Sequence, residues 1–250
     1  MNRFIFFLML IFVSIEMWAI TGAEILSKLD KQMEIKTDIT AKTKITQQKG
    51  DSVKIIECIY YRRDSDDSFL IIMTSPEVEK GNGYLKVGDN FWMYKRNTRT
   101  FQHINRDESI AGTDAKSGDL EKRKMSELYK VAVEGSKEKV SEEMLGKIPV
   151  YKVEVVARVE DFTYPKQILW IHRDNFLVLK VQSFSLSGTL MQSAYYLKYT
   201  EIDKRFVPLQ QIFIDEFEKG NKTIVELSGI SFEKIPDYVF TKAYLENLSK

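Results

Sequence analysis

Reactive and metal-binding side chains are scarce in this sequence. Its 250 residues include one cysteine, Cys58, and two histidines, His103 and His172. A single cysteine excludes an intramolecular disulfide, and so few sulfur and imidazole ligands leave no ordinary closed zinc site. The motifs of serine hydrolases, phosphate-binding loops and zinc proteases are missing as well. We therefore predict no catalytic residue, no metal ion and no cofactor.

The sequence also lacks an excess of charge of either sign. Lysines and arginines number 37 against 36 aspartates and glutamates, which gives a formal net charge of +1. Nucleic-acid-binding domains usually carry a basic excess, so we predict no nucleic-acid partner. The carboxylates between Asp107 and Glu121 could bind a hard cation in principle. They alternate with lysines and arginines, which is typical of a solvated loop.

No apolar run is long enough to span a bilayer. The run Phe4–Val13 is about half of the roughly 20 residues that a spanning helix needs. Arg3 precedes the run and the small residues Thr21–Ala23 follow it, which is the layout of a secretory signal peptide rather than of an uncleaved anchor. We predict that residues 1–23 are a signal peptide cleaved after Ala23. Because no cysteine stands there to carry a lipid, the mature protein is expected to be soluble and not membrane-anchored.

Beyond the predicted signal peptide, the sequence has the pattern of a β-sheet protein. After a short amphipathic helix, apolar and polar residues alternate from Ile35 to Ile45, and turn signals such as Gly50-Asp51 and Gly88–Asn90 separate similar segments. About a dozen short strands follow at hairpin spacing, with no long helical crossover. A final helix can begin at Asp237. This pattern predicts an antiparallel meander in one domain, residues 24–250.

One segment interrupts the alternation. Residues 106–146 are densely charged and contain only scattered apolar residues. We predict a loop insertion here, with one short helix beginning near Asp119. Insertions of this length between hairpins are usually functional or mobile.

Several predicted strands are apolar on both faces. FLIIM at 69–73 and FWMY at 91–94 alternate little, whereas a sheet with one face in water alternates clearly. Something must therefore cover the second face. Either the sheet curves around an interior that a ligand fills in part, or the short helices fill that space. The pattern alone leaves both open.

The order of these features resembles the outer-membrane lipoprotein-sorting family, whose members are similar to the periplasmic carrier LolA. The resemblance rests on the run from Phe69 to Ile104, on GTDAKSGDL at 112–120 and on LGKIPVYKVEV at 145–155, in the expected succession. Ala115 stands where the family usually has an aromatic residue, and 95–97 replaces a segment that usually contains proline. Arg62 and Arg63 are the candidates for the arginine that locks the lid in better-known carriers.

The resemblance implies a mainly β fold, an unclosed barrel of about eleven antiparallel strands with a few helices as a lid. It also implies a periplasmic carrier, not an enzyme, that shields acyl chains of a lipid or lipoprotein. Membrane-bound donor and acceptor proteins are then expected partners. Two rivals remain: an exported envelope interaction module, such as an adhesin or assembly factor with a filled core, and an enzyme that acts through the acidic loop.

The residues that face such a cavity can be predicted in part. Side chains alternate along a strand, so Phe69, Ile71 and Met73 share one face. We expect the cavity to open at the strand ends that lie next to the 106–146 insertion. We predict that the lipid-binding residues are Phe69, Ile71, Met73, Trp92, Tyr94 and Phe101, and that Leu120 and Leu128 rest over the interior as a gate.

Overall fold

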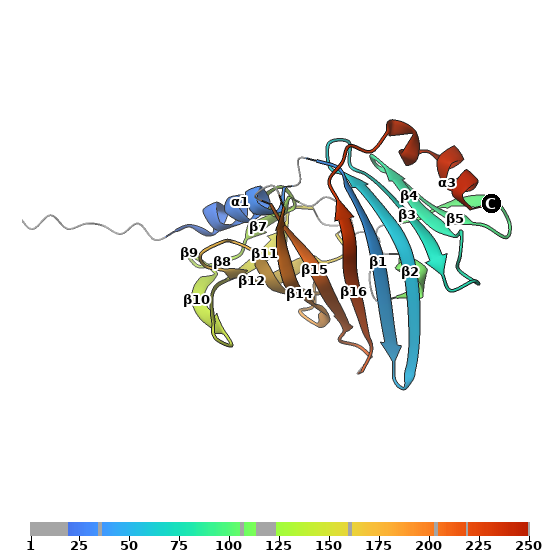
Figure 1. Cartoon of the computed structure of the whole chain (residues 1–250). Coiled ribbons are helices and arrows are strands. Elements are labelled where there is room, and N and C mark those ends of the chain that lie inside the picture. The colour runs from blue at the N-terminus through green and yellow to red at the C-terminus, as the bar shows by residue number, and fades with distance from the viewer. Residues whose placement is uncertain are drawn as a thin grey trace, which may run out of the picture.

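The computed structural model describes residues 20–34, 37–105, 108–113, 124–159, 162–202, 205–218 and 220–249. Its main feature is one antiparallel sheet of fourteen strands (Figure 1). In spatial order these are β10 (Val140–Leu145), β11 (Ile148–Ala157), β12 (Lys166–His172), β13 (Val178–Phe184), β14 (Leu190–Ile202), β15 (Arg205–Asp215), β16 (Lys222–Ser231), β1 (Ile39–Lys49), β2 (Ser52–Arg63), β3 (Ser68–Ser75), β4 (Gly83–Val87), β5 (Asn90–Lys95) and β6 (Thr100–His103), with β7 (Tyr129–Val131) beside β11.

The connectivity is a meander in two halves. Strands β1 to β6 run outward in sequence order, and β10 to β16 return in order until β16 pairs with β1. In the described part of the chain the edge strands β10 and β6 do not pair with each other, so the curved sheet stays unclosed. The predicted mainly β, unclosed antiparallel sheet with few helices is confirmed, with more strands than the eleven expected.

Short helices cover the two faces of the sheet differently. Helix α1 (Gly22–Met33) and helix α2 (Met125–Leu128) lie on the concave face, where Ile25 and Leu26 join the larger core. The 3-10 helix η3 (Asp237–Phe240) and helix α3 (Lys242–Leu248) cover the convex face over β3–β5 (Figure 1). A further 3-10 helix, η1, spans Ile110–Gly112.

The first turn of α1 overlaps the end of the predicted signal peptide. Thr21 and Glu24 form a capping box, in which each side chain accepts the backbone N–H of the other residue. The backbone N–H of Gly22 donates to Glu138 at 2.6 Å. Residues 1–19 lie outside the described part of the chain. Cleavage after Ala23 therefore stays a prediction, and it would remove Thr21 and with it the helix cap.

The predicted loop insertion at 106–146 is wrong in its second half. Strands β7, β8 (Val133–Glu134), β9 (Lys137–Glu138) and β10 occupy most of residues 129–145, and β10 forms an edge of the large sheet. An edge strand with exposed side chains on both faces needs no apolar alternation, so its charged sequence is read as a loop. Asp119 and Leu120 lie outside the described residues, whose only helix in this segment besides η1 is α2.

Among the described residues, the longest helix is α1, with 12 residues. Within the described ranges, no helix is long and apolar enough to cross a bilayer.

Candidate functional site

A cavity of about 460 Å³ lies between the concave face of the sheet and the helices α1 and α2. This volume falls within the roughly 300–1,000 Å³ typical of small-molecule sites. Its wall comes from β1–β3 and β12–β16, and α1, α2 and η1 supply the remaining sides. We call α1 and α2 together the lid. The cavity is thus built from strands of both halves of the meander.

The apolar wall follows from the strand register. Residues directly opposite each other on antiparallel strands share a face. Val225 pairs with Ile45, and Ile45 with Ile56, so one apolar row crosses β16, β1 and β2. A second row crosses the same strands and β3 through Leu227, Thr43, Cys58 and Met73. Alternate residues of each strand therefore line one continuous surface.

Buried Gln, Ser and Thr side chains interrupt this surface at two places. Gln167 on β12, Ser183 on β13 and Gln192 on β14 are direct cross-strand partners, and all three are buried. The Gln167 side-chain amide donates to the Ser183 hydroxyl at 3.0 Å. Thr43 is the second place, on β1. The cavity can therefore contact both apolar chains and neutral polar groups.

Burial controls the chemistry of the cysteine in this wall. Cys58 is 3% exposed. Removal from water raises the pKa of its thiol to about 12, and the nearby Thr43 hydroxyl offsets this only in part. The thiol is therefore protonated at neutral pH and a poor nucleophile.

The lid helix α2 is held at both of its ends. The Asp30 carboxylate of α1 accepts the backbone N–H groups of Met125 at 2.6 Å and Ser126 at 2.9 Å, and the Ser126 hydroxyl at 2.5 Å. At the other end, Arg158 donates to the carbonyls of Ser126 and Tyr129 at 3.2 and 3.1 Å. An anion at the N-terminus and a cation at the C-terminus match the dipole of the helix.

Four of the seven charged residues that line the cavity form two ion pairs. Arg62 contacts Asp64 at 2.5 Å, and Lys124 of the lid contacts Glu127 at 2.8 Å. Burial disfavours the charged form of Arg62, but Tyr60 and Asp64 outweigh this cost and raise the pKa of its guanidinium. Arg62 is therefore a neutralised cation in the cavity wall.

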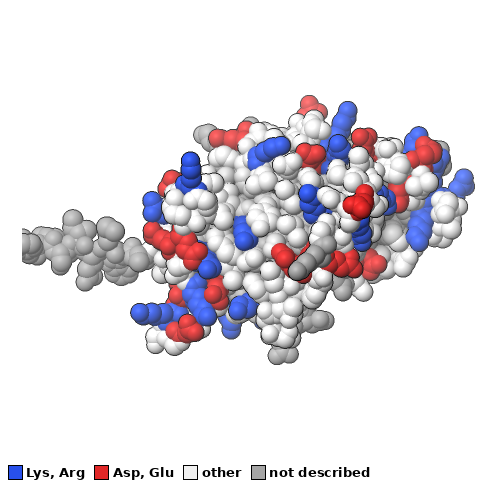
Figure 2. Space-filling model, turned by 90° about the horizontal axis from the view of Figure 1, so that it is seen from below, with Lys and Arg blue, Asp and Glu red and all other residues white. Residues whose placement is uncertain are grey.

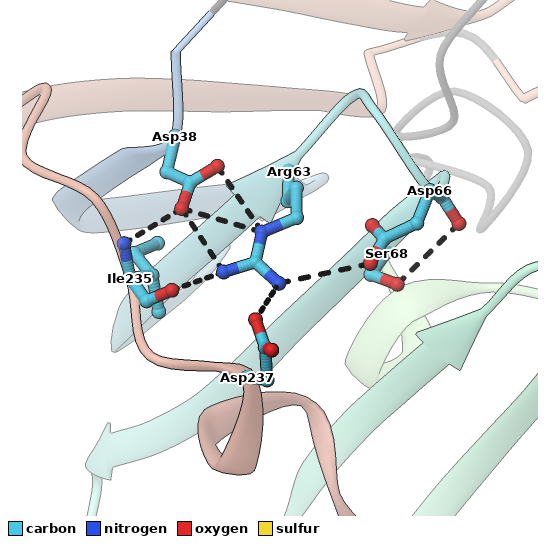
Figure 3. A network of polar contacts seen from close by, with 6 residues as sticks. All are labelled: Asp38, Arg63, Asp66, Ser68, Ile235 and Asp237. Carbon is cyan, nitrogen blue, oxygen red and sulfur yellow. Dashed lines mark hydrogen bonds and ion pairs between the residues drawn. The ribbon is translucent and has the colours of Figure 1, made fainter.

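The convex face carries a separate polar network around Arg63 (Figure 3). The Arg63 guanidinium donates to Asp38 at 3.1 Å, to Asp237 at 2.7 Å and to the carbonyl of Ile235. The N–H of Ile235 donates in turn to Asp38 at 2.6 Å. Arg63 thus fixes the C-terminal segment to the β2–β3 turn. The two arginines singled out in the sequence lie on opposite faces, and only Arg62 lines the cavity.

The structure brings three of the predicted lipid-binding residues to the concave face. Ile71 lines the cavity, and Phe69 and Met73 belong to the same core cluster. Leu120 and Leu128 were predicted to rest over the interior as a gate. Leu128 packs against that cluster from the end of α2, whereas its neighbours Met125–Glu127 line the cavity. Leu120 is outside the described residues.

The other three predicted residues are placed wrongly. Trp92, Tyr94 and Phe101 pack in the convex cluster beneath α3. The register explains this: Ile71 pairs with Tyr84, and Tyr84 with Met93, so Met93 shares the face of Ile71. Trp92 and Tyr94 therefore point the opposite way. The Lys242 ammonium of α3 lies 4.2 Å from the Trp92 ring centroid and 5.2 Å from that of Phe101.

Sequence reasoning missed several residues of the site. Asp30, Gln167 and Gln192 come from segments far apart in the chain, and no local motif marks them. Lys86, whose charge suggests a solvent-facing position, is 2% exposed on the concave side and pairs with Asp67 at 2.5 Å. In the described part of the chain, no group of three His, Cys, Asp or Glu side chains could hold a metal ion.

The surface charges are mixed. Figure 2 shows basic and acidic side chains interspersed on the face that it presents, without a large area of one sign. This distribution agrees with the formal net charge of +1. It offers no broad basic surface to a polyanion on this face.

Comparison with known proteins places the fold. A LolA superfamily protein from Nitrosomonas europaea is 20% identical with a TM-score of 0.75, covering 90% of this chain and 100% of that one. A putative outer membrane lipoprotein-sorting protein domain from Vibrio parahaemolyticus is 17% identical with a TM-score of 0.80, covering 90% and 98%. A DUF1329 family protein from Desulfovibrio piger is 19% identical with a TM-score of 0.78, covering 90% and 97%.

Sequence comparison adds a family. No curated protein matches the chain in sequence. The model of a family described as "Uncharacterized protein" matches residues 65–247, which is most of the chain. The chain therefore belongs to this family, and its fold is that of the LolA-like lipoprotein-sorting proteins.

Proposed function

We propose that this protein is a periplasmic carrier or binding protein that shields the acyl chains of a lipid or lipoprotein in the cavity of its concave face. The observation that carries the proposal is the cavity itself. About 460 Å³ of space lies against apolar rows of β1–β3 and β12–β16, beneath a lid held by a few hydrogen bonds. The LolA-like fold and the export signal predicted from Arg3 and residues 4–13 support the same proposal.

The cavity suits acyl chains energetically. Each buried methylene group contributes about 0.8 kcal/mol, so affinity accumulates over an apolar surface without specific polar contacts. Ile45, Val181 and Val225 supply such a surface. A carrier of this kind needs no catalytic group, and we propose that the protein is not an enzyme.

The partners follow from the same proposal. One of the similar structures is described as a putative outer membrane lipoprotein-sorting protein domain. By analogy, we propose that membrane-bound donor and acceptor proteins deliver and receive the ligand. The rival function, an envelope interaction module, would have a filled core. A cavity between the lid and the sheet favours a carrier instead.

A matched pair of leucine variants tests the proposal. Leu227 faces the cavity from β16, whereas Leu197 on β14 is 38% exposed and does not line it. Leu227→Glu places a charge in the cavity, and burying an unpaired charge is costly, so binding of a fluorescent acyl probe should fall at least tenfold. Leu197→Glu should bind the probe as the wild type does.

Folding must be checked by circular dichroism in both variants before binding is compared. Loss of binding by folded Leu227→Glu alone supports the carrier. If the wild-type protein takes up no acyl probe at any concentration, yet captures a defined envelope protein, the interaction module is the correct function. Equal binding by both variants would place the ligand elsewhere on the molecule.

A further inference from the structure

The segment 20–23 at the start of α1 is part of the folded domain. Ile20 packs against the larger core cluster, and Gly22 is buried. A Cβ atom at Gly22 would lie 2.7 Å from a side-chain carbon of Val131 on β7 and 2.9 Å from one of Val140 on β10. The backbone of the segment therefore fits closely against these two strands, and its removal would uncover both valines.

Hydrogen bonds also hold this segment in place. The backbone N–H of Gly22 donates to the Glu138 carboxylate of β9 at 2.6 Å. The Thr21 hydroxyl accepts the N–H of Glu24 at 3.2 Å, and the Thr21 carbonyl accepts the N–H of Ile25 at 3.0 Å. The first N–H groups of a helix have no partner within the helix itself. Residues 21 and 22 therefore connect α1 to its own cap and to a strand far away in the sequence.

Cleavage after Ala23 would remove all of these contacts. It would also place an ammonium group on Glu24, in the first turn of the helix, where the helix dipole disfavours a positive charge. Loss of a threonine N-cap alone destabilises a helix. Helix α1 forms one side of the cavity, and its Asp30 holds α2. The lid as a whole therefore depends on how firmly the start of α1 is held.

The sequence offers a second position at which the export signal can end. Signal peptides are cleaved after a small residue, and two alanines, Ala19 and Ala23, lie between the apolar run and Glu24. The small residues at 21–23 make Ala23 the choice from sequence pattern. The structure favours Ala19, because cleavage there leaves residues 20–23 in the mature chain. Ala19 itself lies outside the described residues.

We infer that the export signal is cleaved after Ala19, so that the mature protein begins at Ile20 and the segment 20–23 fastens α1 to β7, β9 and β10. A signal peptidase of the host would hydrolyse the Ala19–Ile20 peptide bond, with water supplying the hydroxyl of the new carboxylate on Ala19 and a proton of the new ammonium group on Ile20. The inference rests on the predicted export signal but not on the carrier function, which would survive its failure.

The intact mass of the exported protein tests the inference. The full chain is expressed with its own signal in a bacterium that exports it, and the processed protein should have the mass of residues 20–250. Two variants form a matched pair. Ala19→Leu places a large residue before the proposed bond and should abolish the product that begins at Ile20. Ala23→Leu changes an exposed position of α1 and should leave that product unchanged.

A third variant, Thr21→Ala, shows whether the segment remains and whether it holds the helix. If the mature chain begins at Ile20, the processed variant should be lighter than the wild type by the difference between threonine and alanine. Its melting temperature should be lower by about 2–4 °C, the usual effect of a lost N-cap in a protein of this size. If cleavage follows Ala23, the variant and the wild type yield the same mature molecule, with equal mass and equal melting temperature.

Each result decides a separate part of the inference. A wild-type product that begins at Glu24, or one that retains Met1, would overturn the cleavage site. A product that begins at Ile20, but whose melting temperature is the same with Thr21→Ala, would keep the site and overturn the role of Thr21 in holding α1. Binding of an acyl probe by the processed wild-type protein is measured independently, and its loss would concern only the carrier function.

Discussion

Strands β3–β5 carry apolar residues on both faces, but the convex face is densely packed whereas the concave face borders a cavity. On the convex face, Leu245 of α3 is fully buried against Leu70 and Leu85. A Cβ atom at Gly83 would approach Leu245 to 2.6 Å, so this contact has no spare space. On the concave side, Ile71 borders the cavity. Strands that are apolar on both faces were expected to be covered either by short helices or by a partly empty interior. Both occur in this protein: helix α3 covers the convex face, and the cavity borders the concave face.

The polar contacts on the convex face are also more deeply buried than those that hold the lid on the concave face. The Arg63 network on the convex face ties together the segment before β1, the β2–β3 turn and the C-terminal segment, and Arg63 and Asp38 are both buried. Helix α2 of the lid has no fully buried residue and is held mainly through Asp30 and Arg158, in part-buried or exposed positions. Segments with few buried contacts open at lower free energy, so α2 is the part of the lid expected to move, whereas Ile25 and Leu26 anchor α1 in the core.

The largest expected effect comes from truncating one leucine on each face. Leu245→Ala should lower the free energy of unfolding by about 2–5 kcal/mol, because it leaves a cavity in a filled core. Leu227→Ala, facing the cavity and half-buried, should cost about 1 kcal/mol or less. Urea unfolding measures both. Equal losses would show that the concave side is packed as densely as the convex side.

A smaller effect is expected at the lid. Asp30→Ala removes the carboxylate that caps α2 and should cost about 1 kcal/mol of stability. Since the lid then opens more often, the bound probe should dissociate about fivefold faster, because 1 kcal/mol is close to that factor. Stopped-flow release measures the rate. Asp51→Ala, in the exposed β1–β2 turn, is the control; a slower release from Asp30→Ala would contradict the role of the lid.

Filling the cavity should affect binding while leaving stability almost unchanged. Ala194 on β14 is 4% exposed and lines the cavity. The ring of Ala194→Phe would occupy space that a ligand needs, so probe titration should give weaker binding at a similar melting temperature. Val53→Phe adds a ring at a 59% exposed position of β2 and should bind normally. A strongly destabilised Ala194→Phe protein would mean that the space is already filled.

The smallest effect concerns a single side chain: the reactivity of Cys58 tests whether the cavity wall around it is buried, and it requires no substitution. Its folded-state pKa of about 12 lies above the ordinary thiol value, so the thiolate fraction at pH 8 is minute and rises only as the pH approaches 12. Labelling with a maleimide at pH 8 should therefore be slow in the folded protein and fast in urea. Rapid labelling of the folded protein would contradict the burial of this wall.

Local patterns in the sequence predicted the strands of the meander but not their mutual registration. Alternation within residues 69–73 correctly groups Phe69, Ile71 and Met73. The relation of this group to Trp92 and Tyr94 depends on how β3, β4 and β5 pair, and a shift of one residue exchanges the two faces. The contact of Asp30 with Ser126 spans 96 positions, and nothing local marks it. Strand β10 escaped prediction because an exposed edge carries charge on both faces.

The central claim is that the concave cavity holds acyl chains, and native mass spectrometry of gently purified protein tests it most directly. We expect a population heavier than the bare chain by the mass of one lipid. That adduct should be lost on mild collisional activation and absent from Leu227→Glu, but present in Leu197→Glu. Bare protein in all three preparations, with no adduct after incubation with acyl lipids, would contradict the claim.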